Sequence, residues 1–106
     1  MEGLVPGRIV YFVFGEGDLE NVVRARASSG ARGNALHPGD VYPAMIVRVF
    51  DQSSGMANLK VSLDGPDTYW ATSAHYDAST AVGHTWHWMF DGQQTRYTPA
   101  SAKAGA

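Results

Sequence analysis

The chain has 106 residues, of which 44% are hydrophobic and 17% are charged, and its formal net charge is −2. This length suits one compact domain and excludes a second, while the near-neutral charge argues against nucleic acid as a partner. The sequence contains no cysteine, which excludes disulfides, thiolate metal sites and cysteine nucleophiles.

The first strand is predicted directly after a short lead-in, Met1 to Gly7. The lead-in has an early acid and a proline where a secretory signal needs a basic start and a long apolar run. No apolar stretch approaches the roughly 18 residues that cross a bilayer. We therefore expect neither a cleavable signal nor contact with a membrane. Arg8 to Phe14 then reads as a strand that is apolar on both faces.

A long loop is predicted over residues 15–39, which are rich in glycine, serine, alanine and arginine. Structureless loops of this length are uncommon in compact domains, so we expect it to be ordered by itself or by a partner. Asp18 can cap one helical turn that buries Leu19, Val22 and Val23. Residues 20–25 also fit an extra strand, and we favour a short strand or turn.

The centre of the sequence predicts a β-hairpin. Its first arm, Ala44 to Phe50, is almost unbroken apolar sequence, and its second arm, residues 57–64, alternates strictly. This alternation places four side chains in the core: Ala57, Leu59, Val61 and Leu63. Because the strands at 8–14 and 44–50 are apolar on both faces, something must cover the second face. Strand bending in a small barrel is one explanation, and a subunit interface is the other.

The remaining strands are predicted at residues 68–76 and 85–90. Asp91-Gly92 is a hairpin signal, so residues 93–98 can return as a sixth, edge strand. The aromatic residues can line a cage for a cation or fill the core, and we assign Trp86 and Trp88 to the core.

These elements together predict an all-β fold, a small SH3-like antiparallel barrel of five to six strands. The long loop follows the first strand, and an arm extends from the C-terminus. We expect a single domain over residues 1–106, with the barrel core at about 7–98, the loop excursion at 15–39 and the tail at 99–106.

The polar residues show no catalytic, cofactor or metal signature. His84 and His87 are three residues apart, which on a strand directs them to opposite faces. No serine lies in a Gly-x-Ser-x-Gly motif, and Gly15-Glu16-Gly17 lacks the third glycine of a dinucleotide loop. We therefore predict that the protein is not an enzyme and binds neither cofactor nor metal.

Four stretches carry a resemblance to a known family. They are residues 7–11 (GRIVY), 43–49 (PAMIVRV), 69–73 (YWATS) and 83–88 (GHTWHW). In this order they resemble a family of small proteins encoded by tailed bacteriophages and prophages, over roughly residues 7–90. The closing Thr-Trp-His-Trp is the most specific element. The long excursion and the tail after Phe90 depart from the family pattern. Independently, the strand order resembles SH3-like barrels of the Tudor and KOW type.

The family supplies no established activity, but the phage resemblance, the surplus apolar strand faces and the extra loop and tail together favour a non-enzymatic virion protein. It would be either a capsid decoration (cement) protein or a head–tail accessory component. It would be assembled in the host cytoplasm and contact a major capsid or connector protein and copies of itself. The alternative is an intracellular phage module that binds a host protein or nucleic acid through the barrel. The predicted partner contacts lie in the excursion and tail: Leu19, Val22, Val23, Arg24, Arg26, Arg32, Arg96 and Tyr97.

Overall fold

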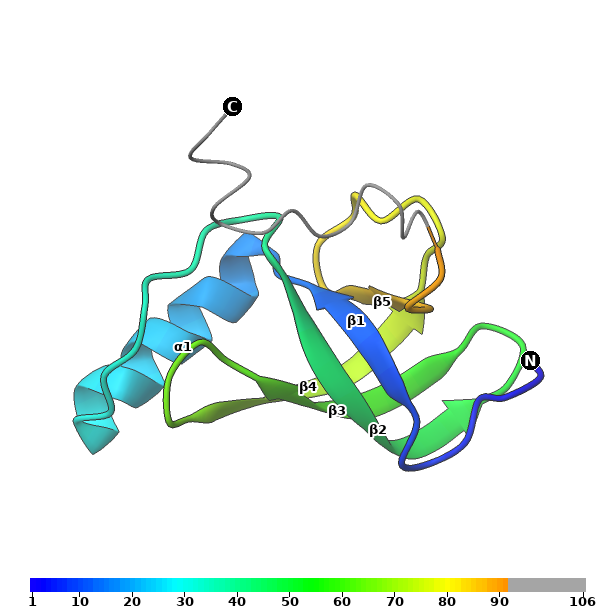
Figure 1. Ribbon diagram of the computed structural model, residues 1–106, viewed down its shortest axis with the longest axis horizontal. Coiled ribbons are helices and arrows are strands. Elements are labelled where there is room, and N and C mark those ends of the chain that lie inside the picture. The colour runs from blue at the N-terminus through cyan, green and yellow to red at the C-terminus, as the bar shows by residue number, and fades with distance from the viewer. Residues whose placement is uncertain (92–106) are drawn as a thin grey trace.

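The sheet closes on itself as a five-stranded barrel (Figure 1). The structure is a computed structural model, and it describes residues 1–91. Its elements are β1 (Ile9–Val13), α1 (Glu16–Ser29), β2 (Val41–Asp51), β3 (Met56–Ser62), β4 (Thr68–Tyr76) and β5 (Thr85–His87). β5 closes the barrel by pairing antiparallel with β1 and parallel with β4. The predicted all-β, small SH3-like barrel is thus confirmed. The predicted sixth strand and C-terminal arm lie outside the described residues.

The central hairpin forms as predicted, from β2 and β3. The four alternating side chains predicted for the core are all buried: Ala57, Leu59, Val61 and Leu63. From β2, Ala44 and Ile46 meet them inside the barrel. Burial on one face and water on the other fixes the register of the hairpin.

Two tryptophans complete the core, as the sequence predicts. Trp86 is fully buried, and its indole Nε1 donates to the carbonyl of Gly55 at 2.7 Å. A Cβ atom on Gly55 would stand 2.7 Å from the Cβ of Tyr76, and the φ of Gly55 is +75°. Only glycine fits this position without strain. Trp88 packs edge-on against Trp86 with 4.9 Å between ring centroids.

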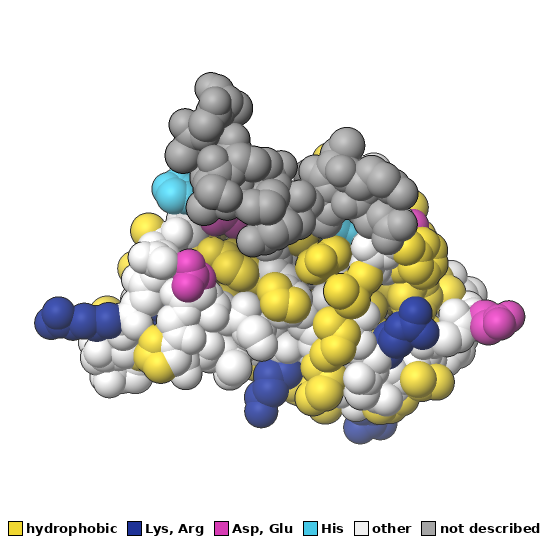
Figure 2. Space-filling model, in the orientation of Figure 1, with side chains coloured by type: hydrophobic (Ala, Val, Ile, Leu, Met, Phe, Trp, Pro, Cys, Tyr) yellow, Lys and Arg dark blue, Asp and Glu magenta, His cyan; other side chains and the backbone are white. Residues whose placement is uncertain are grey.

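The outer face of β1 and β2 is apolar and exposed, which corrects the expectation that strand bending would bury both faces. Ile9, Met45 and Val47 are 43%, 40% and 39% exposed. Ile9 pairs with Met45, and Tyr11 pairs with Pro43. We name the five outward side chains the apolar strip: Ile9, Tyr11, Pro43, Met45 and Val47. Figure 2 shows hydrophobic side chains gathered over these two strands.

Residues 16–29 form a helix, so the short strand or turn favoured from the sequence is wrong. The N-cap is Gly15 rather than Asp18, and Gly30 ends α1 in the left-handed conformation with φ +77°. Of the three apolar side chains expected to be buried, Val22 is 3% exposed and Val23 is 67% exposed. α1 lies beside the barrel at the end of the molecule opposite the N-terminus (Figure 1).

β4 spans the predicted residues 68–76, whereas β5 is shorter than predicted. A register shift between β3 and β4 moves Ala71 and Ala74 into the core and leaves Trp70 49% exposed. β5 ends at His87 rather than at residue 90. In the described part of the chain, no helix has the length and apolar character needed to cross a membrane.

Candidate functional site

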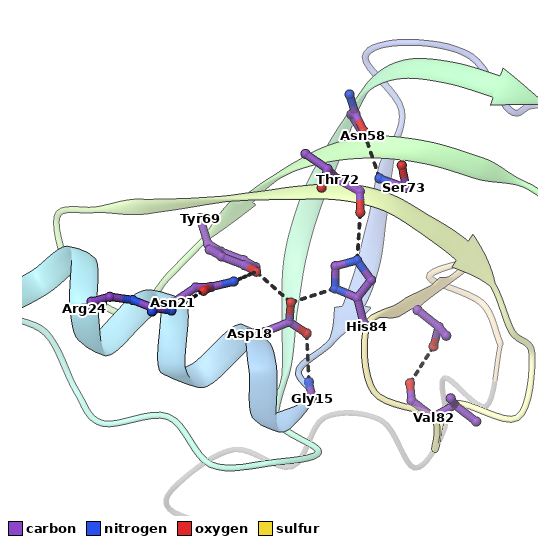
Figure 3. A network of polar contacts seen from close by, with 11 residues as sticks. Gly15, Asp18, Asn21, Arg24, Asn58, Tyr69, Thr72, Ser73, Val82 and His84 are labelled. Atoms are coloured by element: carbon purple, nitrogen blue, oxygen red, sulfur yellow. Dashed lines mark hydrogen bonds and ion pairs between the residues drawn. The ribbon is translucent and has the colours of Figure 1, made fainter.

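A buried carboxylate joins α1 to the barrel. Asp18 is 4% exposed and accepts three hydrogen bonds (Figure 3). Its Oδ2 accepts from the backbone N–H of Gly15 at 2.9 Å, which is one half of a capping box. Its Oδ1 accepts from the hydroxyl of Tyr69 at 2.7 Å and from the Nδ1 of His84 at 2.6 Å. We name Gly15, Asp18, Tyr69, Thr72 and His84 the Asp18 clamp.

His84 spans the distance between α1 and β4. While its Nδ1 faces Asp18, its Nε2 lies 2.8 Å from the carbonyl oxygen of Thr72. A carboxylate and a carbonyl only accept hydrogen bonds, so both ring nitrogens must carry a proton for both contacts to form. With Asp18 ionised, this geometry favours the imidazolium form of His84.

The pKa values of the clamp agree with this assignment. The hydrogen bond to Asp18 raises the pKa of His84, against the opposing effect of burial, and the Thr72 carbonyl raises it further. Burial by itself would raise the pKa of Asp18, but the bonds from His84, Gly15 and Tyr69 outweigh burial and lower it. Burial is also the main cause that raises the pKa of Tyr69 to about 12. The clamp is thus an ion pair with a neutral phenol beside it.

Local backbone geometry brings His84 to this place. β5 pairs with β4 only at His75 and Tyr76, so the carbonyl of Thr72 lies beyond the last β4–β5 pair. His84 lies just before β5 with φ +58°, a left-handed conformation. From there its Nε2 reaches the carbonyl oxygen of Thr72 on β4. The side chain of His84 therefore links the start of β5 to β4 beyond their two register pairs.

A hollow of about 370 Å³ opens beside the clamp. Asn21 and Trp70 line it together with Tyr69 and His84. The Nδ2 of Asn21 donates to the hydroxyl of Tyr69 at 3.2 Å, and its Oδ1 accepts from Arg24 at 2.7 Å. These polar groups are therefore engaged with one another, and half-exposed Trp70 supplies the aromatic wall.

Both ring nitrogens of His84 are engaged with groups of the protein, so the Asp18–His84 pair ties α1 to the barrel. A general base needs a ring nitrogen with a free lone pair aimed at its substrate. Both nitrogens of His84 instead donate to groups of the protein. The Asp18–His84 pair has the composition of the orienting half of a catalytic triad, and the backbone carbonyl of Thr72 lies at the second ring nitrogen.

The structure brings together only some of the predicted contact residues. Val22 is buried on the face of α1 that packs against the barrel. Arg26 pairs with Asp67, with its Nε 2.8 Å from Oδ2 and its Nη2 3.2 Å from Oδ1. Through Asp67, Arg26 ties α1 to the β3–β4 turn, and it also donates to the carbonyl of Asn34, in the segment after α1, at 3.0 Å. The side chains that remain at the surface are Leu19, Val23, Arg24 and Arg32. Arg96 and Tyr97 lie outside the described residues. The predicted contact surface stays a prediction.

Sequence reasoning missed the clamp. Asp18 is separated from Tyr69 by 51 positions and from His84 by 66. The only local signal was an aspartate near a predicted helix start, and it pointed to a cap. Among residues 1–91, no three histidine or carboxylate side chains gather as a metal site would need. No protein family, curated protein or solved structure matches the chain.

Proposed function

We propose that this protein is a non-enzymatic structural component of a tailed-phage virion that acts through protein–protein contacts. It serves as a capsid decoration (cement) protein or as a head–tail accessory protein. The apolar strip is the observation that carries the proposal. The phage context rests on the sequence resemblance described above.

The apolar strip is suited to a contact because it lies on rigid strands. Ile9 and Met45 are a register pair, and Val47 continues the row along β2. The barrel core lies directly beneath them, with Val10, Ala44 and Ile46 buried on the opposite faces of the same strands. A contiguous exposed apolar patch on a well-packed domain is characteristic of interaction surfaces. Its partner is the major capsid or connector protein of the particle.

The alternative, an intracellular module that binds a host protein or nucleic acid, has less support. It is suggested by the resemblance to Tudor and KOW barrels and by three arginines in the excursion, of which Arg26 is paired with Asp67 within the fold. The net charge of −2 provides no attraction to phosphate.

Mass spectrometry of purified virions tests the proposal. We expect the protein in particles of the phage or prophage that encodes it, at a copy number in fixed proportion to the capsid or connector protein. Its absence from purified particles, with the protein present in the infected cell, would contradict the virion assignment and favour the intracellular module.

A binding experiment tests the role of the apolar strip. Purified protein is added to particles that lack it, and the bound copies are counted. Met45→Asp removes an exposed apolar contact and introduces a charge, so we expect at least about a tenfold loss of binding with an unchanged melting temperature. Ala78→Asp adds the same charge at an exposed position after β4, outside the two strands of the strip, and is the matched control. Equal binding by both variants would exclude the strip as the contact.

A further inference from the structure

The outer face of α1 is unusual for a helix that packs on a domain. Leu19, Val23 and Ala27 follow one another at intervals of four residues, which places them in a single row along the helix. The neighbouring position Val22 is buried against the barrel, whereas Val23 is 67% exposed. These side chains line an open hollow on the surface together with Glu20 and Arg24.

The charges on this face are arranged as a self-complementary pair. Glu20 and Arg24 are one helical turn apart, with the acid nearer the N-terminus and the base nearer the C-terminus. A two-fold axis that crosses α1 between them would turn a second helix antiparallel to the first. Glu20 of each copy would then face Arg24 of the other, and the same pair would form twice.

We infer that α1 forms a two-fold, antiparallel contact between two copies of this chain, with Glu20 of each opposite Arg24 of the other. This inference deepens the proposed function, on which it rests, because it names a second copy as one of the partners. The row of Leu19, Val23 and Ala27 supplies the apolar contact. A face with no net charge and one acid–base pair fits its own rotated copy better than it fits a uniformly acidic or basic partner.

The position and size of α1 set the strength of this contact. α1 lies at one end of the molecule, beside rather than inside the barrel (Figure 1), so a copy can approach from that end. Its 14 residues extend about 21 Å. One helix pair of this length buries less than a standard interface, so the dimer is weak in free solution. Copies held close together on a particle would strengthen it through effective concentration.

Charge reversal with mixing tests the inference on the purified full-length chain. Sedimentation equilibrium from about 10 μM to 1 mM measures the dimer dissociation constant of the wild type, Glu20→Arg and Arg24→Glu. Each variant alone places like charges opposite each other twice, so we expect at least a tenfold larger dissociation constant. In an equimolar mixture, two bases on one copy face two acids on the other. The mixture should therefore dimerise at least as tightly as the wild type.

Two controls change the charge by the same amount elsewhere. Glu2→Arg and Lys60→Glu alter exposed residues outside α1 and should leave the dissociation constant unchanged. Thermal unfolding of every variant separates loss of dimer from loss of fold, and rescue on mixing cannot arise from a misfolded chain.

Three outcomes would overturn the inference: a wild type that is monomeric throughout, single variants that dimerise like the wild type, or single variants that fail to recover on mixing. The virion assay separates this result from the proposed function. A monomeric protein found in virions overturns the α1 contact alone, and a dimer absent from virions overturns the virion role alone.

Discussion

Gly83 touches Gly15 through the backbone: a Cβ atom on Gly83 would stand 2.6 Å from the Gly15 Cα. This approach joins the start of α1 to the residue before His84. The Asp18–His84 bond therefore depends on two residues without side chains.

Gly83→Ala is expected to destabilise the protein because the obstructing atom is backbone and cannot move aside by a rotamer change. The loop must shift and stretch the contact between Asp18 and His84. We expect a loss of about 1–3 kcal/mol in the free energy of unfolding by urea, with faster amide exchange in α1. Gly17→Ala is the control, because a Cβ at Gly17 meets nothing within 4 Å. Its stability should stay equal or rise, since alanine is the better helix former. Equal stability of both variants would contradict the close approach.

Stability should fall as the pH rises above the ordinary histidine pKa. The folded-state pKa of His84 is raised above 6.5, so its contribution is complete below pH 6.5 and is lost as the pH passes through the raised value. The pKa of Asp18 is lowered from 3.8, so its contribution is present above pH 3.8 and is lost as the pH falls through the lowered value. The clamp is therefore strongest between these limits.

Melting temperatures measured from pH 4 to 9 check this dependence. His84→Gln keeps one donor but cannot become a cation, so the variant should be less stable than the wild type at pH 5.5. Its melting temperature should show little of the wild type's decline above pH 6.5. His75→Gln alters an exposed histidine of β4 and should retain the wild-type profile. A wild-type profile in the His84 variant would show that this ion pair does not govern the pH dependence.

Tyr69→Phe removes one of the three donors to the Asp18 carboxylate. A hydrogen bond to a buried charge contributes about 1–3 kcal/mol, so we expect a loss of that size in urea unfolding at pH 6. Nuclear magnetic resonance should also show a higher pKa for the Asp18 carboxyl, because a donor to its ionised form is gone. An unchanged carboxyl pKa would indicate that the hydroxyl does not reach Asp18 in solution.

The tryptophans should differ sharply in their contribution to stability. Trp86→Phe leaves a void in the core and removes the bond to the Gly55 carbonyl, at an expected cost of about 2–4 kcal/mol. Trp70→Phe alters a side chain that is 49% exposed and should change stability by less than about 1 kcal/mol. Urea unfolding measures both, and similar losses would show that the burial assignment is wrong.

The elements that the sequence predicted well are those whose signal is local. The β2–β3 hairpin alternates over consecutive residues, and burial of Leu59 and Val61 follows from that alternation alone. The tryptophan assignment depended on size, because a small domain without disulfides needs large side chains in its core. The exposure of the outward face of β2 was harder to predict, because nothing in the local sequence indicates that Met45 and Val47 face solvent.

The sequence did not predict α1 because few of the contacts that stabilise this helix are made within its own residues. Val22 is the only apolar side chain of α1 that is buried, and the other buried residue of the helix is Asp18. A buried carboxylate lowers any sequence-based expectation of a packed helix, because its compensation by Tyr69 and His84 comes from distant positions. Arg26 likewise finds Asp67 41 positions away. Propensity within residues 16–29 could not reveal these bonds.

The shortness of β5 has a consequence for the order in which the chain folds. β2, β3 and β4 are consecutive antiparallel strands and can pair soon after synthesis. β1 must wait longer for its second neighbour, because Val13 pairs with Thr85 across most of the chain. We therefore expect the β1–β5 pairing to form last, through three residues that also place Trp86 in the core. We expect a nascent chain that stops before residue 85 to remain an open sheet whose core side chains are exposed to solvent.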